Sequence, residues 1–153
     1  MPNQRYSRQM QMPQVGELGQ QRLQQAKVLV VGAGGLAASL LPILAASGVG
    51  YLRLYDADRV ELSNLHRQIL FRMSDIGEYK VLAARQHLQQ LNPEVHVDAV
   101  PQHIDSTTLQ AALVDIDIVV DAADRFATTY LLSDACHAGK IPLISASVLT
   151  EQG

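Results

Sequence analysis

Two basic side chains in this sequence have the types that phosphate chemistry would need. Arg67 and Lys80 are cations, and a displacement at a phosphoryl centre needs cations to neutralise the charge that develops on the transferred and leaving oxygens. A guanidinium binds phosphate oxygens at two points, and an ammonium acts as a mobile point charge. Considered singly, each cation is also explained by an ordinary solvated surface position.

A glycine-rich turn is the clearest candidate for binding the phosphates themselves. Gly32, Gly34 and Ala37 fit a Gly-x-Gly-x-x-Gly/Ala pattern between an apolar strand over residues 27–31 and an apolar helix over residues 36–47. At such a turn the backbone can approach an anion closely, and free N–H groups and the helix dipole favour negative charge. The pattern also occurs in plain structural turns, and it suits NAD, FAD and ATP alike. It therefore predicts a nucleotide without selecting one.

Two carboxylates follow predicted strands. Asp56 ends the strand 51–55, about where an acidic residue that binds a ribose is expected after a glycine turn; a surface-turn aspartate is the alternative. Asp124 comes just after the strand 117–121, where it could hold Mg²⁺ through one carboxylate, water and phosphate oxygens. Spacing alone is equally consistent with Asp124 as the N-cap of a helix that begins near Arg125.

The elements that must position these residues alternate along the chain. Strands and helices in turn predict an α/β fold, a Rossmann-like, mostly parallel sheet with helices on both faces, and ligands beyond the carboxyl ends of the strands. Residues 1–26, which are polar and rich in Gln, are expected to form an N-terminal helical arm, and residues 27–153 a nucleotide-binding domain. The remaining elements are expected as a helix over 78–91, a strand over 95–100, a helix over 106–113 capped by Ser106, a helix over 125–139 and a strand over 141–145.

Composition excludes several classes of protein. A formal charge of −3 with no run of Lys or Arg argues against nucleic-acid binding. Neither a signal peptide nor an apolar run of transmembrane length is present, so a cytoplasmic protein without membrane contact is expected. The single cysteine, Cys136, excludes an intrachain disulfide and a cysteine-rich zinc site built from this chain, and its helical apolar surroundings predict burial. The five histidines have no metal-ligand spacing.

A series of short motifs extends over nearly the whole chain. In order, these are Arg5-Tyr-Ser-Arg-Gln9, Gly-Ala-Gly-Gly-Leu at 32–36, Asp56-x-Asp58-x-Val60, Ser63-Asn-Leu-x-Arg-Gln68, Asp75-Ile-Gly77-x-x-Lys80, Leu91-Asn-Pro93 and Asp121-x-x-Asp124. As a set, they resemble the ThiF, MoeB and HesA family, the ubiquitin-activating (E1-like) adenylyltransferases of thiamine and molybdopterin biosynthesis. The resemblance implies ATP-dependent adenylation of the C-terminal Gly-Gly carboxylate of a small ubiquitin-like sulfur-carrier protein, with release of pyrophosphate.

The same resemblance implies roles for individual residues. Asp56 would hold the ribose, and Asp124 matches a magnesium-associated aspartate. Arg8 matches an arginine that reaches across a homodimer interface into the other subunit's ATP site. The implied nucleotide-binding residues are Gly32, Gly34, Gly35, Asp56, Asp58, Ser63, Asn64, Arg67 and Lys80, and the implied catalytic residues are Arg8, Arg67, Lys80 and Asp124, with Asp124 as the metal ligand.

The sequence departs from the family pattern beside the implied magnesium site. Arg125 replaces a usual asparagine, and this long cation could pair with Asp124 or contact a phosphate; Ala37 is an accepted variant of a usual glycine. The C-terminal part of the family fold, with its paired zinc cysteines, is expected to be absent. Two other hypotheses stay open: a non-catalytic nucleotide-binding or partner-docking module of the same fold and, more distantly, an NAD-dependent oxidoreductase.

Overall fold

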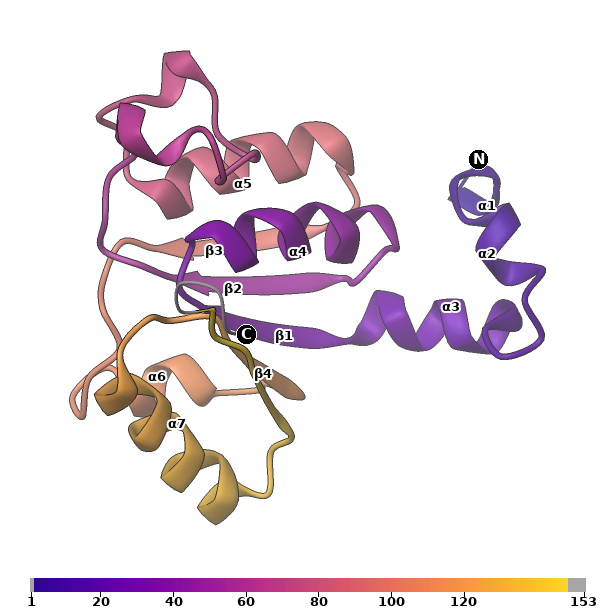
Figure 1. Cartoon of the computed structure of the whole chain (residues 1–153). Helices are drawn as coiled ribbons and strands as arrows, with labels where there is room; N and C mark the ends of the chain where they lie inside the picture. The colour runs from indigo at the N-terminus through magenta and orange to yellow at the C-terminus, as the bar shows by residue number, and fades with distance from the viewer. Residues whose placement is uncertain (1, 149–153) are drawn as a thin grey trace.

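A five-stranded parallel sheet forms the centre of the molecule (Figure 1). The computed structural model describes residues 2–148. All neighbouring strands are parallel, in the order β3-β2-β1-β4-β5, so the order reverses between β1 and β4. The expected α/β, Rossmann-like class is confirmed. The strands are β1 (Lys27–Val31), β2 (Tyr51–Tyr55), β3 (His96–Val100), β4 (Ile118–Asp121) and β5 (Leu143–Ser145).

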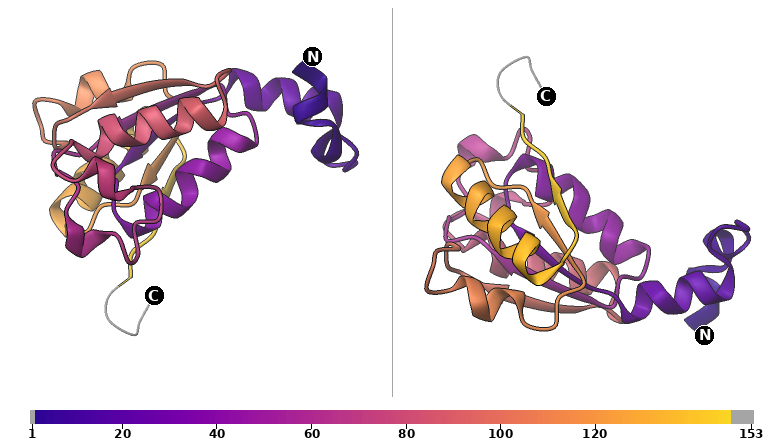
Figure 2. Two further views of the ribbon diagram at one scale, coloured as in Figure 1. Left: turned by 90° about the horizontal axis from the view of Figure 1, so that it is seen from above. Right: turned by 90° about the horizontal axis from the view of Figure 1, so that it is seen from below.

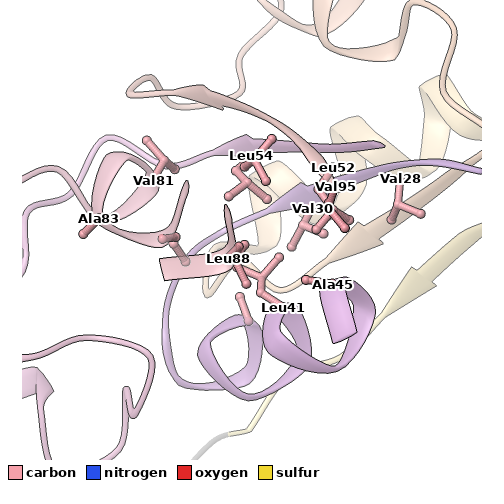
Figure 3. Packing of buried hydrophobic residues seen from close by; sticks show 14 of the residues in the cluster. Val28, Val30, Leu41, Ala45, Leu52, Leu54, Val81, Ala83, Leu88 and Val95 are labelled. Carbon is pink, nitrogen blue, oxygen red and sulfur yellow. The ribbon is translucent and has the colours of Figure 1, made fainter. Parts of the chain in front are cut away.

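Alternating side chains of β1 explain why helices cover both faces of the sheet. Val28 and Val30 belong to a buried cluster that includes Leu41 of α4 and Leu88 of α5 (Figure 3). The strand residues between and after these valines point to the opposite face, where they join a second cluster with α6 and α7. A parallel sheet whose strands are apolar on both sides needs this double cover. The helices are α4 (Gly35–Ala46), α5 (Lys80–Leu91), α6 (Leu109–Leu113) and α7 (Phe126–Gly139).

Three short helices precede the sheet and lie at the amino ends of its strands (Figure 2). The Tyr6 hydroxyl donates to Glu94 Oε2 at 2.9 Å and accepts from Asn92 Nδ2 at 2.8 Å. Gln9 Nε2 donates to the Ser47 carbonyl oxygen at 2.8 Å, just after the last residue of α4. The N-terminal helices are therefore tied to the end of α4 that is farthest from the glycine turn. They are α1 (Pro2–Arg5), α2 (Ser7–Met10) and α3 (Gly16–Gln25).

Helix α5 begins later than its periodicity predicts. Its first residue is Lys80 rather than Glu78, because the Glu78 carbonyl oxygen accepts from the Val60 N–H at 2.9 Å in a short antiparallel pairing. The backbone before Lys80 is thus held as an extended segment and joins the helix only at Lys80.

The prediction for α6 is wrong in both its start and its cap. The helix begins at Leu109 rather than at residue 106, and its N-cap residue is Thr108, with no side-chain cap. Asp105, not Ser106, accepts the hydrogen bonds of the turn before the helix, from the Thr107 and Thr108 N–H groups at 2.8 and 2.9 Å. The Thr107 hydroxyl also donates to the same oxygen at 2.7 Å, and these donors lower the pKa of Asp105 to about 2. A carboxylate accepts these bonds better than a hydroxyl because it carries a full negative charge.

The division into an arm over 1–26 and a domain over 27–153 stays a prediction, and residues 149–153 lie outside the described part of the chain. Within residues 2–148, no helix is both long and apolar enough to cross a membrane.

Candidate functional site

The turn after β1 brings the carboxyl ends of β1 and β4 into contact. Gly32 has φ +96°, and a Cβ at this position would lie 2.7 Å from the Ala122 carbonyl oxygen. Only glycine can occupy it without strain. The Ala122 N–H in turn donates to the Val31 carbonyl oxygen at 2.9 Å. The glycine turn therefore lies where the strand order reverses, which is where ligands bind in sheets of this kind.

The N-terminus of α4 forms one side of a candidate anion site. Gly34 is the N-cap residue, and no side chain caps the helix. A Cβ on Gly34 would approach only Gln68 Nε2, at 4.0 Å, and a Cβ on Gly35 would approach the Arg67 stem, at 3.8 Å. Residues 67 and 68 thus lie beside the turn and leave room for the backbone to meet a ligand. Free N–H groups at a helix N-terminus attract anions.

Asp56 connects this turn to residues 56–79, which join β2 to α5 and are called the crossover segment below. Its carboxylate is buried, with Oδ2 accepting from the Ala33 N–H and Oδ1 from the Asp58 N–H, both at 2.7 Å. The alternative of a surface-turn aspartate is therefore wrong. Each oxygen keeps a second lone pair for a ligand hydroxyl, and ribose binding stays a prediction.

The two ends of the crossover segment are paired with each other. Arg59 and Tyr79 form an antiparallel bridge, and the Arg59 guanidinium carbon lies 3.9 Å from the centroid of the Tyr79 ring. The Gly77 N–H donates to the Val60 carbonyl oxygen at 2.9 Å. Val60 itself is buried in the core. This pairing fixes the direction in which the chain enters α5.

Lys80, the first residue of α5, is buried rather than solvated. Its residue exposure is 6%, and its Nζ lies 3.6 Å from Asp58 Oδ2, while its backbone N–H donates to the Asp58 carbonyl oxygen at 2.9 Å. A buried ammonium needs such a partner to offset desolvation. The ordinary surface explanation is therefore wrong for Lys80. It still fits Arg67, which is exposed.

Ser63 and Asn64 organise the turn that carries Arg67. They lie in the 3₁₀ turn η1 (Leu62–Asn64), where Asn64 Oδ1 accepts from the Glu61 N–H at 3.1 Å. Arg67 Nη1 donates to the Ser63 carbonyl oxygen at 3.1 Å. The polar atoms of this turn are thus partly engaged with one another, and their contact with a nucleotide stays a prediction.

Gln68 ends one of the sequence motifs, but the sequence alone predicts no role for it in the site. It is 3% exposed, and its Oε1 has no hydrogen-bond partner among the residues that the structure describes. A buried carbonyl without a donor costs about 1–3 kcal/mol. Its Nε2 lies beside Gly34, so Gln68 is a candidate for contacting whatever binds there. The signal in the sequence is its place as the last residue of the Ser63-Asn-Leu-x-Arg-Gln68 motif.

Asp121, the last residue of β4, forms hydrogen bonds to several elements near the carboxyl ends of the strands. It is fully buried, and its Oδ2 accepts from the Thr129 hydroxyl at 2.6 Å and the Ser145 hydroxyl at 3.1 Å. Its Oδ1 accepts from the Ala123 N–H at 3.1 Å. One carboxylate therefore links β4, α7, β5 and the loop that leads to Asp124.

Asp124 lies exposed at this edge. The N-cap residue of α7 is Arg125, with no side-chain cap, so the interpretation of Asp124 as the N-cap is wrong. The sequence also suggests that Arg125 could pair with Asp124. Among residues 2–148 the Asp124 side chain forms no hydrogen bond or ion pair, so this pairing is not found. The carboxylate is therefore free to accept a ligand within the described structure.

Arg8 is the one predicted site residue that the chain places elsewhere. It lies exposed on α2, which is attached near Ser47 at the C-terminal end of α4. Twelve residues of α4 separate that end from the glycine turn, a distance of about 18 Å. One copy of the chain does not bring Arg8 together with the other predicted residues.

A hollow of about 250 Å³ lies between the arm and the body rather than at the glycine turn. Its lining includes a carboxylate and no cation, so it does not suit a phosphate. The lining residues are Tyr6, Gln24, Gly48, Gly50, Glu94 and Val95.

No group of three His, Cys, Asp or Glu side chains within residues 2–148 is arranged to hold a metal ion. Cys136 is 2% exposed in the second apolar cluster, so its predicted burial is confirmed. Burial raises the pKa of its thiol.

The parallel sheet, with a glycine turn where its strand order reverses, defines a Rossmann-like α/β domain. The model of the ThiF family matches residues 6–153, and this chain belongs to that family.

The chain is similar to curated proteins that are longer than it is. It is 48% identical over 149 residues to "Sulfur carrier protein adenylyltransferase" of Thermus thermophilus, covering 97% of this chain and 55% of the relative. It is 47% identical over 149 residues to "Adenylyltransferase and sulfurtransferase MOCS3" of Culex quinquefasciatus, covering 97% of this chain and 34% of the relative. The chain therefore spans about half, or less, of these relatives.

Solved structures share the fold. The E. coli tRNA N6-threonylcarbamoyladenosine dehydratase TcdA in complex with ATP superposes with a TM-score of 0.88 at 30% identity, covering 94% of this chain and 58% of that one. E. coli MccB with AMPCPP and MccA superposes with a TM-score of 0.85 at 32% identity, covering 97% and 46%.

Proposed function

We propose that this chain is the nucleotide-binding part of an ATP-dependent adenylyltransferase that activates a ubiquitin-like sulfur-carrier protein at its C-terminal Gly-Gly carboxylate. One observation carries the proposal: hydrogen bonds and one ion pair connect the glycine turn, through Asp56 and Asp58, to the buried cation Lys80. An uncapped helix N-terminus, Arg67 and Lys80 thereby bring positive groups from three segments to one edge. Such an arrangement suits a polyphosphate. The names of the relatives and the ATP complex of TcdA support this choice of ligand and reaction.

The proposed reaction is a displacement at the α-phosphorus of ATP. A carboxylate oxygen of the carrier's terminal glycine bonds to the α-phosphorus, the bond to the α,β-bridging oxygen breaks, and pyrophosphate leaves with the electron pair. Because two anions are brought together, the protein must mainly position them and neutralise charge. Lys80 and Arg67 would address phosphate oxygens, the N–H groups of α4 would bind a phosphate, and Asp56 would hold the ribose. The step needs no protein nucleophile.

Magnesium fits Asp124 as a single protein ligand. Mg²⁺ is often held by one or two carboxylates together with water and substrate phosphates, and Asp124 is an exposed carboxylate at the same edge. The ion would neutralise phosphate charge there.

The partners follow from the same proposal. The acceptor would be a small protein ending in Gly-Gly, of the thiamine or molybdopterin type, encountered in the cytoplasm. The similar solved structure of E. coli MccB contains MccA together with AMPCPP. Arg8 would act in the site of a second copy in a homodimer, since its own site lies at the other end of α4.

A second candidate is a nucleotide-binding or partner-docking module without turnover. It is favoured by the position of Arg8, which one copy of the chain does not bring together with the other predicted site residues. This module would bind Mg-ATP without exchanging pyrophosphate.

The deciding experiment is carrier-dependent exchange of labelled pyrophosphate into ATP, with Mg-ATP affinity measured by calorimetry. We expect Arg67→Ala and Lys80→Ala each to lower exchange at least about 100-fold, since charge-neutralising donors are worth that much in such steps. Arg22→Ala and Lys27→Ala remove matched cations at the opposite end of the sheet and should change nothing. Binding without exchange would select the module, and unchanged exchange in both site variants would remove these cations from the mechanism.

A further inference from the structure

A buried contact between a histidine and a carboxylate, outside the proposed ligand contacts, links the crossover segment to α5. Asp75 lies in the 3₁₀ turn η2 (Met73–Asp75), late in the crossover segment, and His87 lies on α5. Their Oδ2 and Nε2 atoms are 2.7 Å apart, and the two side chains are 9% and 8% exposed. The same Asp75 oxygen accepts from the Arg72 N–H at 2.7 Å. One carboxylate oxygen therefore closes the turn and fastens it to the helix.

One ring nitrogen of His87 is buried at a cost in free energy, which suggests that the ring is kept for the contact that its other nitrogen makes. Its Nδ1 is buried without a hydrogen-bond partner among residues 2–148. A histidine that donates from Nε2 leaves Nδ1 as an acceptor with no donor, and a protonated ring leaves it as a donor with no acceptor. An apolar residue at position 87 would avoid the unsatisfied Nδ1, but it would leave the buried Asp75 carboxylate without its partner on α5. The contact with Asp75 is the interaction that the ring gains in return.

The two residues of this pair are connected along the chain to the two cations of the proposed site. His87 follows Lys80 by seven residues on α5, about two helical turns. Asp75 follows Arg67 by eight residues within the crossover segment. The paired ends of the segment fix Lys80, but the hydrogen bonds of η1 and η2 are local to each turn. The Asp75–His87 contact is thus the side-chain hydrogen bond that ties η2 to the helix bearing Lys80.

We propose that His87 is a positioning residue: through Asp75 it holds the crossover segment against α5, so that Arg67 and Lys80 keep the spacing that a bound polyphosphate requires. This rests on the proposed function for the identity of the ligand. The role proposed for His87 goes beyond the proposed function, because His87 would contact neither the nucleotide nor the carrier protein. A small displacement of a positioned group can lower a rate strongly, and a buried carboxylate that loses its partner moves toward solvent or takes up a proton.

The test compares two replacements of His87 in the full chain. His87→Gln keeps an amide N–H near the position of Nε2, whereas His87→Leu keeps the volume and removes the donor. Gln86→Leu, at the exposed neighbouring position, is the matched control. Each variant is examined by thermal unfolding, by hydrogen exchange of the amides of residues 72–80, and by pyrophosphate exchange at varied Mg-ATP.

We expect His87→Leu to speed hydrogen exchange in residues 72–80 at least about tenfold through local opening and to lower kcat at least about tenfold. His87→Gln should restore both, and Gln86→Leu should match the wild type. A purely structural role would instead lower the unfolding temperature and leave kcat and local protection of the folded protein unchanged, which would overturn the proposal. Equal loss in the Gln and Leu variants would also overturn it.

The readouts separate this proposal from the proposed function. If the wild-type chain shows no pyrophosphate exchange, hydrogen exchange still tests whether His87 fastens residues 72–80. If exchange occurs and His87→Leu leaves both readouts unchanged, only the positioning role of His87 fails.

Discussion

Lys80 contacts Asp58 through both its ammonium and its backbone: Nζ lies 3.6 Å from Oδ2, and the N–H donates to the carbonyl oxygen at 2.9 Å. The two side chains differ in exposure, at 7% for Lys80 and 61% for Asp58. The Lys80 side chain is therefore held in a buried position, while the Asp58 carboxylate faces solvent. An incoming phosphate could share the ammonium without dislodging the backbone of either residue.

This geometry predicts separate outcomes for the two residues. Lys80→Met should weaken Mg-ATP binding and lower pyrophosphate exchange at least about 100-fold, because a preorganised cation is lost from a poorly solvated position. Lys27→Met removes an exposed lysine whose ion pair with Asp115 spans 4.0 Å, and it should leave both measurements unchanged.

Asp58→Asn tests the partner. The backbone contacts to Lys80 and Asp56 remain, and one negative charge near the proposed phosphates disappears. We expect Mg-ATP affinity by calorimetry to stay within about tenfold of wild type, because the amide oxygen of the new side chain can still accept a hydrogen bond from the Lys80 ammonium. A collapse as deep as that of Lys80→Met would show that Asp58 itself is indispensable to the site.

Alanine substitutions at Gly32 and Gly34 should differ in their effect on the free energy of unfolding. Gly32→Ala forces a side chain onto φ +96° and places Cβ 2.7 Å from the Ala122 carbonyl. It should lower the free energy of unfolding by about 1–3 kcal/mol from strain and about 1–3 kcal/mol from overlap. Gly34→Ala meets only Gln68 at 4.0 Å, so its stability should change by less than about 0.5 kcal/mol.

Gly34→Ala should nevertheless weaken Mg-ATP binding, since the methyl group occupies the approach to the helix N-terminus. Urea unfolding and calorimetry distinguish the two effects. Wild-type nucleotide affinity in a well-folded Gly34→Ala protein would place the ligand away from this turn.

Gln68→Leu should separate stability from binding. It removes a buried Oε1 that lacks a partner among the described residues, so the unfolding temperature should stay equal or rise. It also removes the Nε2 beside Gly34, and Mg-ATP affinity should fall about 5- to 30-fold, the equivalent of about 1–2 kcal/mol for one hydrogen bond. Gln86→Leu is the exposed control. If Mg-ATP affinity is unchanged, Gln68 does not contact the nucleotide and serves only in packing.

Cys136 should be inert in the folded protein. Burial raises the pKa of its thiol, and the thiolate is the reactive form. Alkylation by iodoacetamide at pH 8, followed by mass spectrometry, should be slow in buffer and rapid in urea. The sign of the linkage also follows: the unfolded thiol loses its proton first, so stability falls as pH rises from the usual thiol pKa toward the raised value. Fast labelling of folded protein would contradict the burial.

Much of this architecture follows from local patterns in the sequence. Apolar strands alternating with helices predict a parallel sheet, and the glycines at 32 and 34 predict the turn where its order reverses. Both depend on residues that are neighbours along the chain. The burial of Cys136 follows in the same way from helical periodicity.

The rest depends on contacts between distant segments. The buried Lys80 pairs with Asp58, which lies 22 residues earlier in the chain. Gln68 lies beside Gly34 because the crossover segment turns back over α4. Asp75 and His87 lie on a turn and a helix, with no periodicity that relates them. The Asp56 carboxylate takes the Ala33 N–H, a contact between the ends of two strands. Residue type alone does not encode these pairings.

The attachment of the arm near Ser47 has a consequence for enzyme kinetics. If Arg8 takes part in the reaction, it must do so in a neighbouring copy, and specific activity should rise with protein concentration until association is complete. Mixing an excess of Arg67→Ala chains with Arg8→Ala chains would then restore activity through hybrid pairs that each hold one intact site. Two inactive preparations would complement each other, which no arrangement confined to one chain allows.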